Sequence, residues 1–158
     1  MSCIGINAKE GEDVMSLENF EQLKLENQLC FPLYAGAKEV VRKYKPFLDE
    51  IDLTYTQYIS MMVLWEKKQV NVKELGSALY LDSGTLTPLL KKLEAKGYIT
   101  RCRSKEDERN LEVCITEKGN ALKEKAAQIP FKMGECVSLT QEEAAQLYSL
   151  LYKLLGNL

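Results

Sequence analysis

The chain has 158 residues, of which 46% are hydrophobic and 28% are charged, and its formal net charge is −2. This length and composition are typical of one folded domain and exclude a disordered chain. The absence of histidine excludes Cys-His and Ser-His nucleophile pairs, and the five cysteines show no C-x-x-C spacing of structural zinc. We therefore expect a protein that is not an enzyme and that holds no metal ion or cofactor.

Residues 1–15 are polar, lack a signal-peptide pattern and are expected to form a flexible extension, so that residues 16–158 make up a single domain. The longest apolar run, from Ile59 to Trp65, is far shorter than a membrane span. We expect a cytoplasmic protein with no membrane partner.

Helical spacing of apolar residues dominates the folded part of the chain. The first helix is expected from about Gln28 towards Leu48. Thr or Asn followed three residues later by Gln or Glu predicts three more helix starts. These helices are expected near 55–67, 72–80 and 141–157. A helix over 84–96 follows Asp82 and is closed by Gly97, and "EKGNALKEKAAQI" is a helix that ends near Pro130.

Two strand-like segments, "YITRCRS" and "NLEVCIT", are joined by the polar turn "KEDER" and predict a two-stranded hairpin. Two short helices followed by a hairpin is the order of a winged helix-turn-helix. The predicted fold class is therefore mainly α with a small β-hairpin. In that architecture the second helix enters the major groove of DNA and the hairpin, or wing, reaches the adjoining backbone or minor groove.

The candidate recognition helix, 84–96, contains Pro88, which is tolerated where the backbone amide is already unpaired, and this places the helix start near Gly84 or Thr85. Amides at such a start favour phosphate. From residue 85 to residue 105 there are six basic residues and one acidic residue, so the local charge favours DNA despite the net charge. The candidate DNA-binding residues are Ser83, Thr85, Thr87, Lys91, Lys92, Arg101, Arg103, Asp107 and Arg109. The alternative is a capped surface helix with solvated lysines, beside a wing whose Asp107 and Arg109 form a surface salt bridge.

The stretch "LDSGTLTPLLKKLEAKGYITRCRSKEDERNLEVCITEKG" resembles the winged-helix core of MarR-type regulators, including the D-x-R motif of the wing. The segments "LCFPLYA" and "KPFLDEIDLTYTQY" resemble the OhrR-like branch of organic-peroxide sensors and the related staphylococcal one-cysteine regulators. The resemblance covers roughly Leu25 to Leu158. It implies a homodimeric repressor that leaves a pseudo-palindromic operator on double-stranded DNA when a cysteine is oxidised by an organic hydroperoxide or a related oxidant.

Cys30 is the candidate sensor on physical grounds as well. Asn27 as an N-cap and Pro32 in a first turn would place Cys30 at a helix start, where free amides favour the thiolate that attacks peroxides. Tyr34 shares its helix face. Tyr44 lies about 21 Å farther along the same helix and cannot touch Cys30 within one straight helix, but a partner chain packed across a dimer axis could bring it there. The alternative for Cys30 is a small buried hydrophobic residue.

The resemblance implies that Tyr44 and Tyr55 of the other subunit hydrogen-bond the reactive sulfur and that Tyr34 also lines the site. It further implies that oxidised Cys30 reacts either with a small thiol or with a second cysteine of the partner, for which Cys136 has about the right position. We favour Cys136. Cys102 and Cys114 are expected to be packing residues of the wing strands.

The last helix carries a leucine-rich face that exceeds the needs of a small monomer and predicts dimerisation. The expected organisation is a winged-helix core over 52–119 and a helical dimerisation region over 16–51 and 120–158. Two other functions stay open. One is a MarR-type repressor that responds to a phenolic ligand or to an electrophile such as a quinone or hypochlorite, and the other is a thiol peroxidase with a helical fold.

Overall fold

The computed structural model describes residues 20–103 and 111–157. The chain divides into two units, Met1–Lys43 and Tyr44–Leu158. The predicted extension over residues 1–15 and the wing residues Asp107 and Arg109 lie outside the described residues.

In the first unit, two 3₁₀ turns, Glu21–Leu23 and Leu25–Asn27, precede the helix α1 (Cys30–Asp49). The predicted N-cap at Asn27 is wrong: its side-chain amide donates to the backbone oxygen of Glu21 at 2.8 Å and belongs to the preceding turn. The expected place of Cys30 is nevertheless confirmed, since Cys30 is the first residue of α1. The helix continues across the boundary into the second unit.

The second unit contains the predicted helices α2 (Tyr55–Lys67), α3 (Val72–Leu79), α4 (Ser83–Ala95) and α7 (Gln141–Leu155). Thr54 and Thr140 form capping boxes at the starts of α2 and α7, with both reciprocal hydrogen bonds present. The side chain of Asn71 accepts a hydrogen bond from the backbone N–H of Glu74 at 2.7 Å and starts α3. The three predicted helix starts are therefore confirmed.

The predicted two-stranded hairpin is incomplete, because the sheet has three antiparallel strands. They are β1 (Gln69–Asn71), β2 (Ile99–Arg103) and β3 (Leu111–Ile115), in the order β1-β3-β2. Val70 and Arg101 both pair with Val113 of the central strand. Three residues are too few to show the alternation of apolar and polar side chains by which a strand is predicted. The sequence therefore did not predict β1.

The predicted single helix over 117–129 is also wrong. The chain forms α5 (Glu117–Ala126) and a separate α6 (Ile129–Cys136), and Pro130 lies in the first turn of α6. Proline favours the first turn of a helix, where its missing N–H costs no intrahelical hydrogen bond. The residue read as a helix stop is therefore a helix start.

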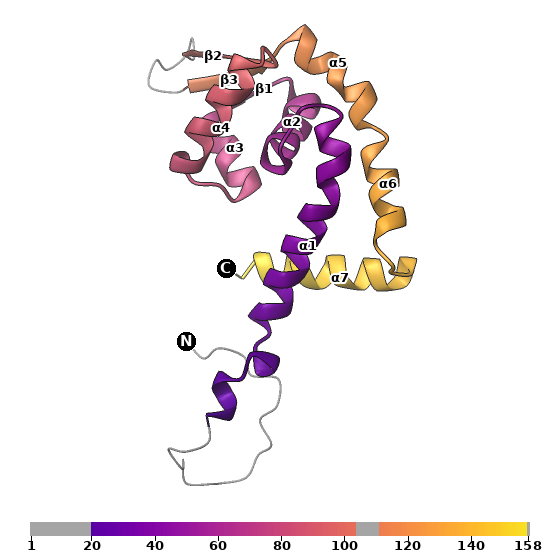
Figure 1. The fold of residues 1–158 in the computed structure, drawn as a ribbon. Coiled ribbons are helices and arrows are strands. Elements are labelled where there is room, and N and C mark those ends of the chain that lie inside the picture. Colours follow the sequence, from indigo (N-terminus) through magenta and orange to yellow (C-terminus); the bar gives the residue numbers. More distant parts are fainter. Residues whose placement is uncertain (1–19, 104–110, 158) are drawn as a thin grey trace. The chain divides into compact units, whose positions relative to one another are not determined.

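The core of the second unit fixes α4 against α2, α3 and the sheet (Figure 1). Leu86, Leu90 and Leu93 of α4 are at most 1% exposed and form the predicted apolar stripe. Trp65 of α2 donates its indole N–H to the backbone oxygen of Gly119 at 2.9 Å. A Cβ at Gly119 would lie 2.1 Å from the backbone oxygen of Tyr98, so only glycine permits this close approach of α5 to the sheet.

Candidate functional site

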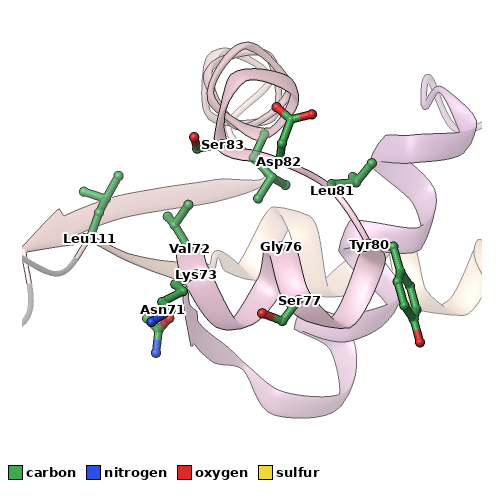
Figure 2. Close-up of a pocket in the computed structure, with 11 residues that line it drawn as sticks. Asn71, Val72, Lys73, Gly76, Ser77, Tyr80, Leu81, Asp82, Ser83 and Leu111 are labelled. Atoms are coloured by element: carbon green, nitrogen blue, oxygen red, sulfur yellow. The ribbon is translucent and has the colours of Figure 1, made fainter. Parts of the chain in front are cut away.

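The turn between α3 and α4 has the geometry of a tight helix-turn-helix corner. Tyr80 caps α3 in the left-handed region, with φ of 54°. A Cβ at Gly76 would lie 2.8 Å from the backbone oxygen of Leu81 and 3.1 Å from Cδ1 of Leu86. Gly76 therefore lets α3 approach the start of α4. An open groove runs along this corner, lined by α3, the turn and Leu111 of β3 (Figure 2).

Asp82 fixes the start of α4, as predicted. Its carboxylate accepts hydrogen bonds from the backbone N–H of Thr85 at 2.8 Å and from the Thr85 hydroxyl at 3.1 Å. These bonds, the backbone one first, lower the pKa of Asp82. The helix begins at Ser83, one residue before the predicted start. Pro88 therefore lies inside α4, where the predicted start at Gly84 or Thr85 had placed it closer to the first turn.

The predicted DNA-binding residues of α4 are all exposed. They are Ser83, Thr85, Thr87, Lys91 and Lys92. The hydroxyl of Thr87 donates to the backbone oxygen of Ser83 at 2.8 Å, and that of Thr85 donates to Asp82. Both hydroxyl oxygens keep lone pairs that can accept hydrogen bonds, which suits the amino groups of bases better than phosphate oxygens. Among the described residues, Lys91 and Lys92 form no ion pair.

The two wing arginines have different surroundings. Arg101 of β2 donates from Nε to Oε2 of Glu94 in α4 at 2.9 Å, and its backbone N–H donates to Oε1 at 3.2 Å. The side-chain hydrogen bond of Arg101 is the main cause of a lowered pKa of Glu94. Arg103 is exposed and makes no ion pair within the described part of the chain. Arg101 therefore joins β2 to α4, the candidate recognition helix, whereas Arg103 makes no such link among the described residues.

The first turn of α2 adds residues to the candidate DNA-binding surface that the sequence did not predict. Thr54, Thr56 and Gln57 line a shallow groove together with Thr85 and Lys92 of α4. The hydroxyls of Thr54 and Thr56 lie 3.3 Å apart at the start of α2. The capping-box pattern of Thr54 and Gln57 marked this helix start in the sequence, but it could not indicate that α4 would lie beside it.

In the first unit, Cys30 and Tyr34 occupy the first two turns of α1. Cys30 is a free and exposed cysteine, and Tyr34 is 63% exposed. The ammonium group of Lys38 lies 5.9 Å from the centre of the Tyr34 ring. Cys30 is therefore not buried within the single chain.

In the second unit, Tyr44 and Tyr55 form an aromatic cluster with Tyr58. The ring centres of Tyr44 and Tyr55 are 5.0 Å apart, and those of Tyr44 and Tyr58 are 6.0 Å apart. Burial raises the pKa of Tyr44 and of Tyr58, which keeps both phenols protonated. Tyr58 is 3% exposed and belongs to the core, as predicted. The phenols of Tyr44 and Tyr58 thus remain hydrogen-bond donors.

The remaining described cysteines are all free. Cys136 is the last residue of α6 and is half-buried. Cys102 and Cys114 lie on adjacent wing strands, Cys102 exposed and Cys114 half-buried. The described residues contain no group of three or more His, Cys, Asp or Glu side chains placed to hold a metal ion.

The last helix, α7, buries none of its residues in the chain. Its exposed residues include Leu147 at 45%, Leu150 at 64% and Tyr152 at 57%. This apolar helix face is a candidate contact surface for another chain. Among residues 20–103 and 111–157, no helix has the length and apolar character needed to cross a membrane.

Comparisons with known proteins agree with this geometry. A family model described as transcriptional regulator SarA/Rot matches residues 42–126. The organic hydroperoxide resistance transcriptional regulator of Bacillus subtilis is 50% identical over 143 residues, which cover 90% of this chain and 97% of that protein.

Among solved structures, reduced AbfR bound to DNA is 32% identical, covers 87% of this chain and 96% of its own, and has a TM-score of 0.72. AbfR is a protein of Staphylococcus epidermidis. Its disulfide-formed structure is 31% identical, covers 87% of this chain and 93% of its own, and has a TM-score of 0.63. The predicted winged-helix fold is thereby confirmed. The chain belongs to the MarR-type DNA-binding transcriptional regulators, in the branch of the organic hydroperoxide resistance regulators.

Proposed function

We propose that the protein is a homodimeric repressor that binds a pseudo-palindromic operator and leaves it when an organic hydroperoxide oxidises Cys30. The observation that carries the proposal is the exposed thiol of Cys30 at the first residue of α1, in a chain similar to a hydroperoxide resistance regulator. Free amides at a helix start favour a thiolate, which is the form that attacks peroxides.

DNA binding is supported by the exposed side of α4 and by the wing. Ser83, Thr85 and Thr87 would read base edges in the major groove, while Lys91 and Lys92 would contact phosphates. Arg103 would approach the DNA from the wing, together with Asp107 and Arg109. Arg101 takes part through its link to Glu94, which holds β2 against α4. Thr56 and Lys92, which line one groove, would hold a backbone phosphate.

A homodimer is supported by α7, whose leucines lie uncovered in the single chain. In this proposal residues 16–51 and 120–158 make the dimer and residues 52–119 bind DNA. Two recognition helices related by a two-fold axis would then meet successive major grooves. The dimer would also bring the partner's tyrosine cluster to Cys30, where the phenols of Tyr44 and Tyr55 donate hydrogen bonds to the sulfur, with Tyr34 beside it.

The chemical step is the attack of the Cys30 thiolate on the peroxide O–O bond. One oxygen is transferred to sulfur and gives a sulfenic acid, while the other leaves as an alkoxide that takes up a proton. The thiol of Cys136 from the partner then attacks the sulfenic sulfur, forms a disulfide and releases water. A bond between subunits changes the preferred dimer geometry, and DNA affinity falls because the two recognition helices lose their spacing.

The experiment is fluorescence anisotropy of the reduced protein on DNA from upstream of its own gene, before and after one equivalent of organic hydroperoxide. The wild-type protein should dissociate and Cys30→Ser should stay bound. Cys136→Ser, run beside them, should form a sulfenic acid without a linked dimer on non-reducing electrophoresis. If Cys30→Ser and the wild type stay bound equally after oxidation, the peroxide-sensing proposal fails.

The same samples distinguish a sensor from a thiol peroxidase. A sensor consumes about one hydroperoxide per subunit, whereas a peroxidase turns over repeatedly when dithiothreitol is supplied. Continued peroxide consumption with dithiothreitol would contradict the proposal. A phenolic compound that displaces DNA from Cys30→Ser would instead support a ligand-responsive repressor.

A further inference from the structure

A second pair of cysteines lies in the wing, outside the proposed sensor. In the register of β2 and β3, Cys102 is opposite Glu112 and Cys114 is opposite Thr100. Cys102 and Cys114 are therefore diagonal neighbours on one face of the antiparallel pair, because side chains two residues apart on a strand point to the same side. The opposite face carries Val113 and Ile99, which are at most 1% exposed, so the two thiols lie on the outer face of the sheet.

The two thiols differ in exposure. Burial is the largest cause of a raised pKa of Cys114, and the neighbouring Cys102 thiol adds to it. Cys102 is exposed and Cys114 is half-buried, so an oxidant in solution meets Cys102 first. The pair thus has an accessible sulfur with a protonated thiol beside it.

We propose that Cys102 and Cys114 form a second redox site, a dithiol that organic hydroperoxides convert into a disulfide across the wing strands. The Cys102 thiolate attacks the O–O bond, takes one oxygen as a sulfenic acid and releases an alkoxide, which is protonated to an alcohol. The Cys114 sulfur then attacks the sulfenic sulfur, and the S–O bond breaks. The hydroxyl leaves with the proton of Cys114 as water.

The strand geometry allows this bond with a small adjustment. Diagonal residues of an antiparallel pair have Cα atoms about 7–8 Å apart, with the Cβ atoms closer. A disulfide spans Cα atoms up to about 6.8 Å apart, so the strands need to draw together by about 1 Å. The bond would lie within one chain and would join Cys102 of β2 to Cys114 of β3. It does not depend on Cys30 or on a partner subunit, unlike the bridge in the proposed function.

The test uses the full chain with Cys3→Ser, Cys30→Ser and Cys136→Ser, which leaves only the wing pair. Reduced protein is treated with tert-butyl hydroperoxide, and free thiols are counted after denaturation. Both thiols should disappear together and return with dithiothreitol. Trypsin cleaves after Arg101, Arg103, Arg109 and Lys118, so the dipeptide Cys102-Arg103 should be found linked to the peptide 110–118.

Two control variants carry Cys102→Ser or Cys114→Ser in the same background. In the Cys114→Ser control, Cys102 should accumulate as a sulfenic acid that dimedone traps, because its resolving thiol is missing. Persistence of both thiols in the wing-pair protein, or trapping of Cys102 with Cys114 still free, would overturn the proposal.

The disulfide-linked tryptic peptides are also sought in oxidised wild-type protein, because this avoids any folding defect of the triple variant. A Cys102–Cys114 link without one between Cys30 and Cys136 would support the wing site and count against the two-cysteine sensor. The reverse pattern would reject the wing site alone.

Discussion

The guanidinium group of Arg101 in β2 is held by the carboxylate of Glu94 in α4, with Nη2 2.5 Å and Nε 2.9 Å from Oε2. The backbone N–H of Arg101 donates to the other oxygen, Oε1, at 3.2 Å. One carboxylate therefore fixes both the main chain and the side chain of the wing strand. This link ties the wing strand to α4, the candidate recognition helix.

We predict that Glu94→Gln and Arg101→Gln weaken DNA binding by similar amounts, up to about fivefold, because each breaks the same partly exposed ion pair. The double variant should be little weaker than either single one, since coupled residues are not additive. Anisotropy titrations at several salt concentrations measure both effects. If Arg101→Gln alone lowers the salt slope by about one, Arg101 contacts a phosphate directly and the positioning role is wrong.

The same link should make the wing sensitive to acid. The pKa of Glu94 is lowered in the folded protein by Arg101, so the folded state binds fewer protons there than the unfolded chain. The stabilisation is present above the pKa of the unfolded glutamate, about 4.3, and is lost as pH falls through the lowered folded value. The Tm of the wild type should therefore be higher than that of Glu94→Gln at neutral pH. The difference in Tm should disappear in acid. An unchanged gap in Tm down to pH 3 would contradict this prediction.

Gly76 should tolerate no side chain. The Cβ of Gly76→Ala would lie 2.8 Å from the backbone oxygen of Leu81, which cannot move without shifting the turn into α4. We expect a loss of about 1–3 kcal/mol in the free energy of unfolding, as overpacking usually costs. The matched control is Gly134→Ala in α6, where no atom lies within 4 Å of the added Cβ. That change should stabilise the protein by about 0.5–1 kcal/mol. Urea unfolding of the two variants compares them directly.

The sequence predicted the helices whose caps are local and missed features that depend on distant strands or short segments. Thr54, Asn71 and Asp82 mark helix starts because each side chain bonds an amide three residues on. The strand β1 has three residues and exists because β3 offers it an edge, which no local pattern shows. Pro130 predicted the end of a helix, whereas in the structure it lies in the first turn of α6. Proline is compatible with both places, because it interrupts a helix but is tolerated in the first turn of the next one.

The candidate site shows the same difference between features set by the local sequence and features that depend on distant segments. The exposed residues of α4 could be predicted from the period of its buried leucines, Leu86, Leu89, Leu90 and Leu93. The partner of Arg101 could not, because Glu94 lies seven positions earlier in the chain, on the other side of a turn. The diagonal placement of Cys102 and Cys114 likewise depends on the register of two strands, in which Val113 lies in the core.

The tyrosine cluster should affect the rate of the proposed reaction of Cys30. If the phenols of Tyr44 and Tyr55 hydrogen-bond the thiolate, Tyr44→Phe and Tyr55→Phe should each slow oxidation of Cys30. A hydrogen bond to a charged group is worth at least about 1.5 kcal/mol, which corresponds to a rate loss on the order of tenfold. Stopped-flow loss of the Cys30 thiol, in protein with the other cysteines replaced by serine, measures the rate constant with an organic hydroperoxide.

Tyr58→Phe is the matched control, because Tyr58 is in the same cluster but packs in the core, with its ring 6.1 Å from that of Trp65. It should leave the rate unchanged, and all three variants should bind operator DNA as the wild type does. Equal rates in wild type, Tyr44→Phe and Tyr55→Phe would remove the tyrosines from the sensor and leave Cys30 to be activated by the start of α1 alone. Slower oxidation of Cys30 in Tyr58→Phe would instead indicate that the packing of the cluster, and not the loss of a hydrogen-bond donor, controls the reaction.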